Sequence, residues 1–536
     1  MARTQWRPYP YALAEVVRNE KEEVTATTPG KDYDVAIVGG GINGVAIAHE
    51  AAGQGLSVLL VEKRDLASGT SSASTGIVHG GVRYVPQMHF RLVRESLKER
   101  RELLKIAPHV VHPMTFAFVH QPGQAPYLGI RFVLKVYDWL AGRLPGNLHG
   151  SYGLNLTKHP FGNPLEGHLR RAVAYSDCQT MDARLVVLTA AAAAHKGAEV
   201  LTRTECVGLS QAGGRWEITL RDAKGTWGVT ARAVVNATGP WVRSFIDETQ
   251  VGAEDAPGLR LIKGSHIIVP RQYEGEHAYV IGQPDGRIVF AIPYEDDFTL
   301  IGTTDVEYAG DAGDFGDVRI SDAEVDYLCD AFNRVSRSKI TRDQVRGDYA
   351  GLRAQYDDGR SASEVSREFK LHLHEGAAAP LLSVYGGKLT THRVLGQQAV
   401  KMLLKGLGAN EKPWNRLEPL PGGEMEDFNA FLEQQYVRYA RLPRELVRRY
   451  ARTYGTRMDH FLEGATTVGD LGRAFSKDLY EAEVRYLVSH EWARTVDDIL
   501  WRRTKLKLTT SEQEAATLAE ALPDIVASVA DDMREL

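Results

Sequence analysis

Blocks of apolar and polar residues along this chain predict an α/β protein that begins with a parallel unit. Val35 to Val38 form a short apolar run, which is typical of a strand buried on both faces of a sheet. A helix rich in small residues is predicted from near Ile42, and a second buried strand at Val58 to Val61. This order of strand, helix and strand predicts that the two strands lie parallel, joined by the helix.

The turn between the first strand and the helix has the spacing of a dinucleotide-binding loop. Gly39, Gly41 and Gly44 form G-x-G-x-x-G, which allows a tight turn, close approach to a pyrophosphate and close helix–strand packing. The N–H groups that begin the helix would point at the phosphate. Glu62, after the second strand, is placed to accept hydrogen bonds from a ribose. We predict an adenine dinucleotide site; the alternative is a glycine-rich turn in an ordinary α/β unit.

Two later segments repeat the pattern of a strand followed by glycine, "RAVVNATGPWV" from Arg232 and "LLSVYGGKLTTHR" from Leu381. Cofactor-type segments are spread widely along the chain. This favours an FAD fold with two interleaved domains, because an NAD-binding half would be contiguous in sequence. The short β-rich runs between Lys263 and Asp305 predict an antiparallel sheet that covers the flavin. The expected fold class is therefore α/β, with a Rossmann-type FAD-binding domain interleaved with an antiparallel-sheet substrate domain and a C-terminal all-helical domain.

Domain boundaries follow from changes in composition. Residues 1–30 are expected to be an N-terminal extension along the first domain. Residues 31–415 are expected to hold the FAD-binding domain (about 31–120, 180–245 and 375–410) and the substrate-binding domain (about 121–179 and 246–374). After the linker "LEPLPGGEM", apolar residues at helical spacing predict a helical domain over 416–536.

Charge and cysteine content exclude several classes of partner. A formal net charge of −5 gives no reason to expect nucleic acid. Three widely separated cysteines form no metal-binding pair, so no metal site is expected, and they indicate a reduced, cytoplasmic protein. The apolar stretch Tyr127 to Gly142 carries three charges and is too short to span a bilayer. It is either an amphipathic helix in a membrane interface or a domain helix with one wet face.

Several longer motifs identify a family. "GGGINGVAIA", "HGGVRY", "YSDCQTMDARLV", "VNATGPWV", "RLIKGSHIIVP", "IGTTDVEY", "GGKLTT" and "EVRYLVSHEWARTVDDILWRRTKL" resemble the FAD-dependent glycerol-3-phosphate dehydrogenases of the D-amino-acid-oxidase-like flavoproteins. The resemblance implies FAD as cofactor, sn-glycerol 3-phosphate as substrate and a membrane quinone as electron acceptor. It also implies a cytoplasmic protein, with attachment to the inner face of the membrane as an option. The oligomeric state is not fixed, and a homodimer is one option.

The resemblance also assigns residues to roles. Substrate binding is expected of Arg83, Tyr84, Thr304, Arg353, Arg367 and Lys388, with Asp305 shaping the same pocket, and catalysis of His79, His266 and Arg353. A histidine would take the hydroxyl proton, because its pKa of about 6.5 lies near neutral pH. Cofactor contacts are expected from Gly39, Gly41, Asn43, Gly44, Glu62, Thr70, Ser71, Ser72, Ser74, His79, Gly80, Gly81, Ala237, Thr238, Gly239, Gly387, Lys388, Leu389 and Thr390.

Two positions depart from the family pattern. Gly76 stands where a lysine is usual before the "HGG" motif, and Ala354 where a proline follows the "GLR" motif. Either change could alter the preferred polyol phosphate. Three alternatives therefore stay open: erythritol 4-phosphate as substrate, oxygen as acceptor, and a flavin-binding sensor without turnover.

Overall fold

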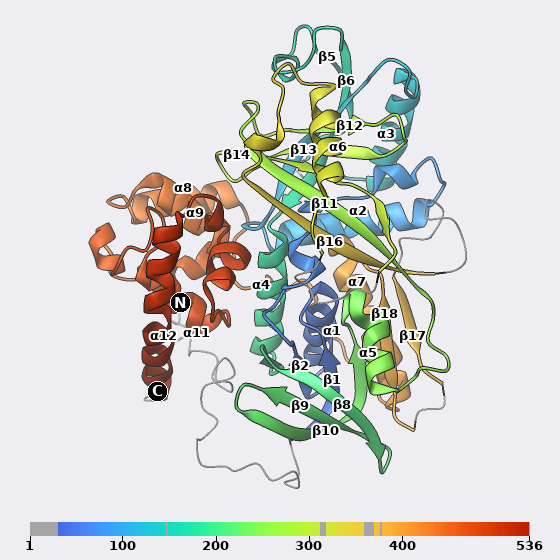
Figure 1. The fold of residues 1–536 in the computed structure, drawn as a ribbon, viewed down its shortest axis with the longest axis vertical. Coiled ribbons are helices and arrows are strands. Elements are labelled where there is room, and N and C mark those ends of the chain that lie inside the picture. The colour runs from blue at the N-terminus through green and yellow to red at the C-terminus, as the bar shows by residue number, and fades with distance from the viewer. Residues whose placement is uncertain (1–30, 146–147, 311–317, 358–368, 376–377, 535–536) are drawn as a thin grey trace.

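The computed structural model describes residues 31–145, 148–310, 318–357, 369–375 and 378–534. Two large sheets lie end to end along the molecule, and a helical unit lies at their side (Figure 1). We call the sheet that contains the dinucleotide loop sheet A and the other sheet B. The predicted fold class is confirmed, whereas the expected extension 1–30 lies outside the described residues.

Sheet A has eight strands, in the order β17-β18-β10-β1-β2-β7, with β9 beside β10 and β8 beside β9. Strands β18, β10, β1, β2 and β7 are parallel to one another, and β7 lies at the edge of the sheet. The strands are β1 (Asp32–Val38), β2 (Val58–Val61), β7 (Glu199–Leu201), β8 (Glu205–Ala212), β9 (Arg215–Asp222), β10 (Gly225–Asn236), β17 (Lys370–Leu373) and β18 (Leu381–Tyr385). The predicted first two strands are thus present, and they pair in parallel.

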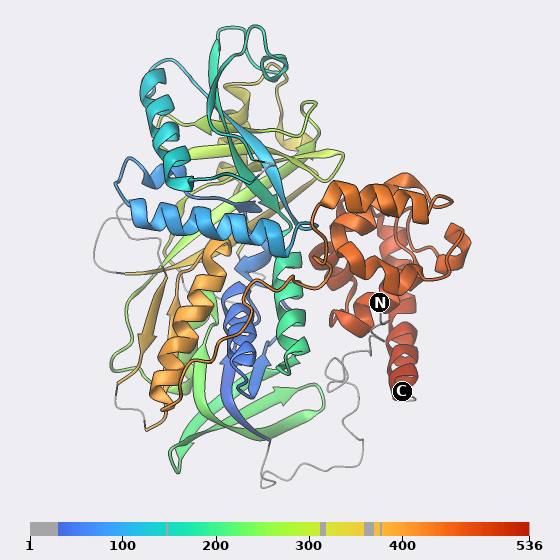
Figure 2. The same ribbon diagram turned by 180° about the vertical axis from the view of Figure 1, so that it is seen from behind.

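Three helices lie side by side on one face of sheet A, the face seen in Figure 2. They are α1 (Ile42–Gly53), α4 (Asp182–His195) and α7 (His392–Gly406). Small residues let them approach closely, since a Cβ at Gly396 of α7 would lie 2.7 Å from the carbonyl oxygen of Ala46 in α1. The short helix α5 (Val242–Thr249) contacts β18 and β8. The packed interface excludes water from the strands that carry the dinucleotide loop.

Sheet B has ten strands, in the order β15-β11-β14-β13-β12-β4-β6-β3, with β16 beside β11 and β5 beside β6. Pairing is antiparallel except between β12 and β4. The strands are β3 (Ile77–Val78), β4 (Val111–Val119), β5 (Tyr152–Asn155), β6 (Arg171–Thr180), β11 (Leu259–Pro270), β12 (Ala278–Gly282), β13 (Ile288–Tyr294), β14 (Phe298–Gly302), β15 (Val306–Tyr308) and β16 (Gly347–Tyr356). Strands β3 and β4 precede residue 120, so the chain enters this sheet earlier than the expected domain boundary.

Helices cover both faces of sheet B. Helix α6 (Asp322–Asn333) packs on one face, where Leu328 and Phe332 join the core formed with β11 and β13. Helices α2 (Phe90–Ile106) and α3 (Tyr127–Ala141) pack on the other face, seen in Figure 2. Helix α3 confirms that the stretch from Tyr127 is helical. Among the described residues, no helix is long and apolar enough to cross a membrane.

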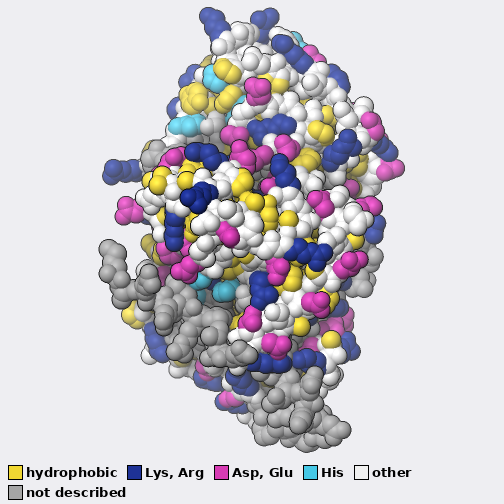
Figure 3. All heavy atoms as spheres, turned by 90° about the vertical axis from the view of Figure 1, so that its left-hand side faces the viewer, with side chains coloured by type: hydrophobic (Ala, Val, Ile, Leu, Met, Phe, Trp, Pro, Cys, Tyr) yellow, Lys and Arg dark blue, Asp and Glu magenta, His cyan; other side chains and the backbone are white. Residues whose placement is uncertain are grey.

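The C-terminal unit is helical and has its own apolar core. Its helices are α8 (Phe428–Arg438), α9 (Arg444–Tyr454), α10 (Asp459–Leu462), α11 (Glu481–His490) and α12 (Glu512–Arg534). On the face of the molecule that carries this unit, basic and acidic side chains are interspersed (Figure 3). Such mixing fits solvated helix surfaces.

Buried ion pairs join the helical unit to the dinucleotide-binding part. Arg503, which is fully buried, donates from Nη1 and Nη2 to the carboxylate of Asp65 at 2.7 and 2.8 Å. Glu491, beyond α11, accepts two hydrogen bonds from Arg184 of α4. The C-terminal motif beginning at Glu483 therefore fixes the loop that follows Glu62.

Candidate active site

The glycine motif forms a turn in which Gly39 and Gly44 leave no room for a side chain. Gly39 has a φ of +115°, and a Cβ there would lie 2.5 Å from the carbonyl oxygen of Ala237. A Cβ at Gly44 would lie 1.9 Å from the carbonyl oxygen of Gly39. The loop after β1, the start of α1 and the segment after β10 therefore meet backbone to backbone. This bare backbone is what a pyrophosphate needs for close approach.

Glu62 provides the carboxylate that the sequence predicts for a ribose. Its oxygens accept hydrogen bonds from the backbone N–H groups of Gly40 at 2.7 Å and Arg64 at 2.8 Å. Burial raises the pKa of Glu62, while these two N–H groups lower it. Close by, Ser71 Oγ accepts from the backbone N–H of Ile42 in the first turn of α1. The donor and acceptor set fits an adenosine diphosphate group.

The Ser/Thr-rich loop joins the dinucleotide turn to sheet B. Thr70 Oγ1 donates to the carbonyl of Leu352 in β16 at 2.6 Å, and Ser74 Oγ donates to Asp182 at 2.8 Å. The Ser72 hydroxyl faces its own loop, with Gly69 O at 3.4 Å. These contacts fix residues 70–74 against β16 of sheet B and the start of α4, and the segment then continues into β3.

The "HGG" and "GGK" motifs also converge. The backbone N–H of His79 donates to Thr390 Oγ1 at 3.2 Å, and Asn43 Nδ2 donates to Gly386 O at 2.9 Å. A Cβ at Gly387, whose φ is +101°, would lie 2.8 Å from Asn43 Oδ1. That oxygen is buried and has no hydrogen-bond partner among the described residues. An unpaired acceptor, Asn43 Oδ1, beside the backbone of Gly387 suits an edge of the cofactor that donates hydrogen bonds.

The other predicted cofactor residues lie in these same segments. Ala237 follows β10 and its N–H donates to Val38 O, while Thr238 and Gly239 lead into α5. Gly81 has a φ of +78° and follows Gly80, whose N–H donates to the hydroxyl of Tyr137. Lys388, Leu389 and Thr390 lead into α7.

Cationic side chains from distant parts of the chain meet around one carboxylate. Arg353 Nη1 lies 2.6 Å from Asp305 Oδ1, and Arg83 Nη1 lies 3.7 Å from Asp305 Oδ2. Lys388 Nζ lies 4.2 Å from the centre of the Tyr84 ring, and Tyr84 adjoins Arg83. We call Arg83, Tyr84, Asp305, Arg353 and Lys388 the cationic cluster. The cluster holds three cations but only one carboxylate, and this excess of positive charge suits a phosphate ester.

His266 lies beside this cluster, buried in sheet B. Its Nε2 is 2.9 Å from Thr75 Oγ1, and its ring stacks on Tyr349 with centroids 4.8 Å apart. Burial lowers the pKa of His266 to about 3, and the positive charge of Arg353 adds to this effect. The imidazole is therefore neutral near pH 7. Its Nδ1 is buried and has no hydrogen-bond partner among the described residues.

Three other predicted residues are placed differently from this group. Thr304 is fully buried, and its hydroxyl contacts Glu324 and the N–H of Ser265, so only its carbonyl faces Arg353, at 3.4 Å from Nη2. His79 is half-buried on the loop beside η7 (Leu389–Thr391). Arg367 lies outside the described residues.

The sequence did not indicate the buried residues that pack against the site loops and against His266. Asp177 accepts hydrogen bonds from Arg100 and Tyr137, and all three are buried beneath Gly80. Tyr349 stacks on His266 and donates to Ser74 O at 2.9 Å. The "YSDC" part of a family motif contains Asp177, so a signal was present, but its partners lie in other elements.

Gly76, where the family resemblance leads us to expect a lysine, has a backbone that disfavours one. Its φ is +65°, and a Cβ would lie 2.8 Å from the carbonyl oxygen of Thr180. We expect Gly76→Lys to lower the free energy of unfolding by about 1–3 kcal/mol, because the residue must leave the left-handed region or displace β6. Urea denaturation checks this, with Gly123→Lys as control. Gly123 also has a positive φ but open space around it. Equal losses in both variants would contradict the packing argument.

Because many histidines are buried, we predict that the free energy of unfolding decreases in mild acid. Burial lowers the pKa of many of them well below 6.5, among others to about 3 for His49, His109, His112 and His266, and to about 4 for His392. Between pH 6.5 and 4 the unfolded chain therefore binds more protons than the folded chain, so stability decreases as pH falls. Each histidine contributes up to about 1.4 kcal/mol per pH unit. Urea midpoints at pH 7.5, 6.5, 5.5 and 4.5 test this, and His109→Asn should give a shallower slope. A midpoint that is constant from pH 7.5 to 5 would contradict it.

Comparison with known proteins assigns the fold and cofactor. The family described as FAD dependent oxidoreductase matches residues 34–393, and the C-terminal domain of alpha-glycerophosphate oxidase matches residues 416–533. The chain belongs to the FAD-dependent oxidoreductase family. Its cofactor is FAD, and the predicted resemblance to the glycerol-3-phosphate dehydrogenases is confirmed.

Relatives cover nearly the whole chain. A glycerol-3-phosphate dehydrogenase of Pseudomonas aeruginosa is 47% identical, covering 91% of this chain and 95% of its own. A D-erythritol 1-phosphate dehydrogenase of Brucella abortus is 44% identical, covering 91% and 97%. The solved glycerol-3-phosphate dehydrogenase of Bacillus halodurans, complexed with FAD, superposes with a TM-score of 0.72 at 27% identity, covering 94% of this chain and 91% of that one.

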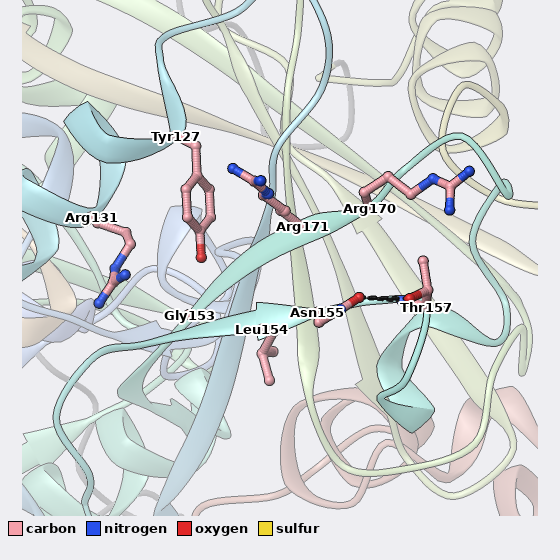
Figure 4. A pocket seen from close by; sticks show the side chains of 8 residues that line it. All are labelled: Tyr127, Arg131, Gly153, Leu154, Asn155, Thr157, Arg170 and Arg171. Atoms are coloured by element: carbon pink, nitrogen blue, oxygen red, sulfur yellow. Dashed lines mark hydrogen bonds between the residues drawn. The ribbon is translucent and has the colours of Figure 1, made fainter.

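A separate pocket lies at the outer end of sheet B, beside α3. Figure 4 shows the guanidinium groups of Arg131 and Arg171 on either side of the Tyr127 ring, with Arg170 farther along the rim. On the same helix, Leu128, Phe132 and Trp139 expose 74%, 69% and 78% of their surface. Exposed apolar residues at helical spacing next to arginines are typical of a helix that lies in a membrane interface.

Proposed function

We propose that this FAD-dependent enzyme oxidises sn-glycerol 3-phosphate to dihydroxyacetone phosphate and passes the electrons to a membrane quinone. The observation that carries the proposal is the cationic cluster, in which Arg83, Arg353 and Lys388 gather next to the loops that hold the cofactor. The names of the relatives support the same substrate class.

In this proposal the chain's own residues bind the phosphate and manage the hydroxyl proton. Arg83 and Lys388 hold the phosphate, while Arg353 stabilises negative charge that develops on the substrate oxygen. When bound, FAD accepts the hydride from C2 of the alcohol. His266 or His79 takes the hydroxyl proton; His266 is neutral near pH 7, but its pKa of about 3 makes it a weak base, and His79 is the alternative. Rate–pH profiles of His266→Asn and His79→Asn identify which histidine is the base.

Flavin reduction tests the activity directly. Anaerobic addition of glycerol 3-phosphate should bleach the oxidised flavin absorbance, and a quinone analogue should restore it. A flavin that stays oxidised would leave the fold intact but overturn the activity in favour of a sensor. Stoichiometric hydrogen peroxide formed in air without quinone would instead favour oxygen as the acceptor.

A second substrate is favoured by one relative. The Brucella abortus protein is named for D-erythritol 1-phosphate and is nearly as similar to this chain as the glycerol-3-phosphate dehydrogenases. Phosphates of erythritol present the same charged group on a longer polyol. Comparing kcat/KM for glycerol 3-phosphate, D-erythritol 1-phosphate and erythritol 4-phosphate decides the substrate, and a preference for either longer compound would replace our proposal.

We also propose that α3 docks the enzyme on the inner face of the membrane. Its exposed apolar side chains would enter the interface, and Arg131, Arg170 and Arg171 would meet lipid phosphates. Phe132→Glu and Trp139→Glu should reduce sedimentation with vesicles that contain anionic lipid. Val437→Glu, an exposed apolar position on α8, is the control. Unchanged sedimentation of the α3 variants would contradict docking through this helix.

A further inference from the structure

Two histidines and an aspartate meet at the edge of sheet A, away from the cationic cluster. His372 lies on the edge strand β17 and His374 directly after it, two residues apart, so both side chains point to the same face. Asp255 lies between α5 and β11 and reaches them from 117 residues upstream. One ligand atom from each of the three side chains lies within 4.8 Å of the others.

The three side chains are already held in a convergent arrangement. Asp255 Oδ1 lies 2.6 Å from His374 Nδ1, and Asp255 Oδ2 lies 3.1 Å from His372 Nε2. The backbone N–H of Glu375 donates to Asp255 Oδ2 at 2.9 Å, which orients the carboxylate. The two imidazole rings stand nearly perpendicular, 4.6 Å between centroids. Each residue thus presents one atom to a shared point.

The second nitrogen of His374 has a partner behind it. His374 Nε2 lies 2.8 Å from Ser383 Oγ, and Ser383 is fully buried in β18. Metal-binding histidines commonly hold a hydrogen bond at the nitrogen that does not touch the metal, which fixes the tautomer. The order Asp255, His374, Ser383 resembles a hydrolytic triad, but the enclosed serine cannot meet a substrate.

Gly252 keeps the space beside the ligand atom clear. Its φ is +74°, and a Cβ there would lie 2.4 Å from His374 Nδ1. Any side chain at this position would therefore collide with the His374 imidazole. Glycine lets the loop that carries Asp255 pass close to the histidines.

We propose that Asp255, His372 and His374 bind a divalent cation of the zinc type. Two imidazole nitrogens and one carboxylate oxygen are the ligands that Zn²⁺ prefers, and water would complete a tetrahedral set. The cation would tie the loop before β11 to β17, next to the strand that leads into Gly386 and Gly387. Its role would be structural, because none of its ligands belongs to the cationic cluster. The cysteines, on which the sequence-based expectation of no metal rested, take no part.

Metal titration of the FAD-loaded enzyme tests the site. After treatment with a chelator and dialysis, the protein should bind one Zn²⁺ per chain in isothermal titration calorimetry, and Co²⁺ should give visible ligand-field absorption beyond the flavin bands. His372→Ala and Asp255→Asn should each weaken this binding at least tenfold. Both positions are only half-buried, so the variants should fold, and retained flavin absorbance verifies this.

His168→Ala, at an exposed histidine elsewhere, is the matched control and should bind like the wild type. Zinc should also raise the melting temperature of the wild type and the control but not that of His372→Ala. Unchanged zinc affinity in His372→Ala and Asp255→Asn would mean that the ion binds elsewhere and would overturn the proposal. Absence of a zinc heat signal and of cobalt absorption in the wild type would overturn it as well.

Discussion

Replacing Arg353 with methionine is expected to lower kcat/KM for glycerol 3-phosphate by about 10²–10³-fold, since losing one positioned group that stabilises developing negative charge costs about 2.7–4 kcal/mol. Two effects add in this variant. The positive charge near the substrate oxygen disappears, and Asp305 loses its partner at 2.6 Å. The remaining Arg83, at 3.7 Å from Asp305, would then be drawn toward the carboxylate and away from phosphate. Steady-state kinetics at constant flavin content measure the loss.

Two further variants isolate the cause. Arg353→Lys keeps the charge but loses the planar pair of donors, so an intermediate loss is expected. Arg215→Met removes an exposed arginine paired with Asp32 on sheet A and should leave the kinetics unchanged. A wild-type kcat/KM in Arg353→Met would remove the cationic cluster from the mechanism.

Arg503→Met is expected to lower the free energy of unfolding by about 3–5 kcal/mol, because it leaves a buried carboxylate with incomplete pairing. Arg503 binds Asp65 through two hydrogen bonds and also donates to the backbone carbonyl of Glu491. Asp65 lies three residues after Glu62, so the loop that carries the ribose acceptor should loosen. We therefore expect FAD to dissociate more readily, although Arg503 lies in the helical unit.

Urea denaturation and release of fluorescent free flavin measure the two effects of this variant. Arg485→Met is the matched control, because its exposed pair with Asp532 lies within the helical unit. Exposed pairs contribute about 0–1 kcal/mol, so this variant should keep its flavin. Equal midpoints and equal flavin release in the two variants would show that the helical unit does not support the cofactor loop.

The sequence by itself determined the features that depend on local pattern. The apolar run before Gly39, the glycine spacing and the acid after the second strand are contiguous, and each follows from the steric needs of one turn or one strand. Buried parallel strands are recognisable because both faces must be apolar. The helix from Tyr127 and the helical C-terminal unit also followed from periodicity alone, and longer motifs added the cofactor and family.

Only the tertiary structure decided which distant side chains meet. Arg353 faces Asp305 because β16 pairs with β11 and the chain returns beside it after β14, a register that no local signal encodes. Burial of His266, which lowers its pKa to about 3, depends on Tyr349 and Thr75 from other elements. The meeting of Asp255 with two histidines likewise needs the edge of sheet A in place. Proximity and desolvation are properties of the packed chain, so they cannot be derived from spacing along it.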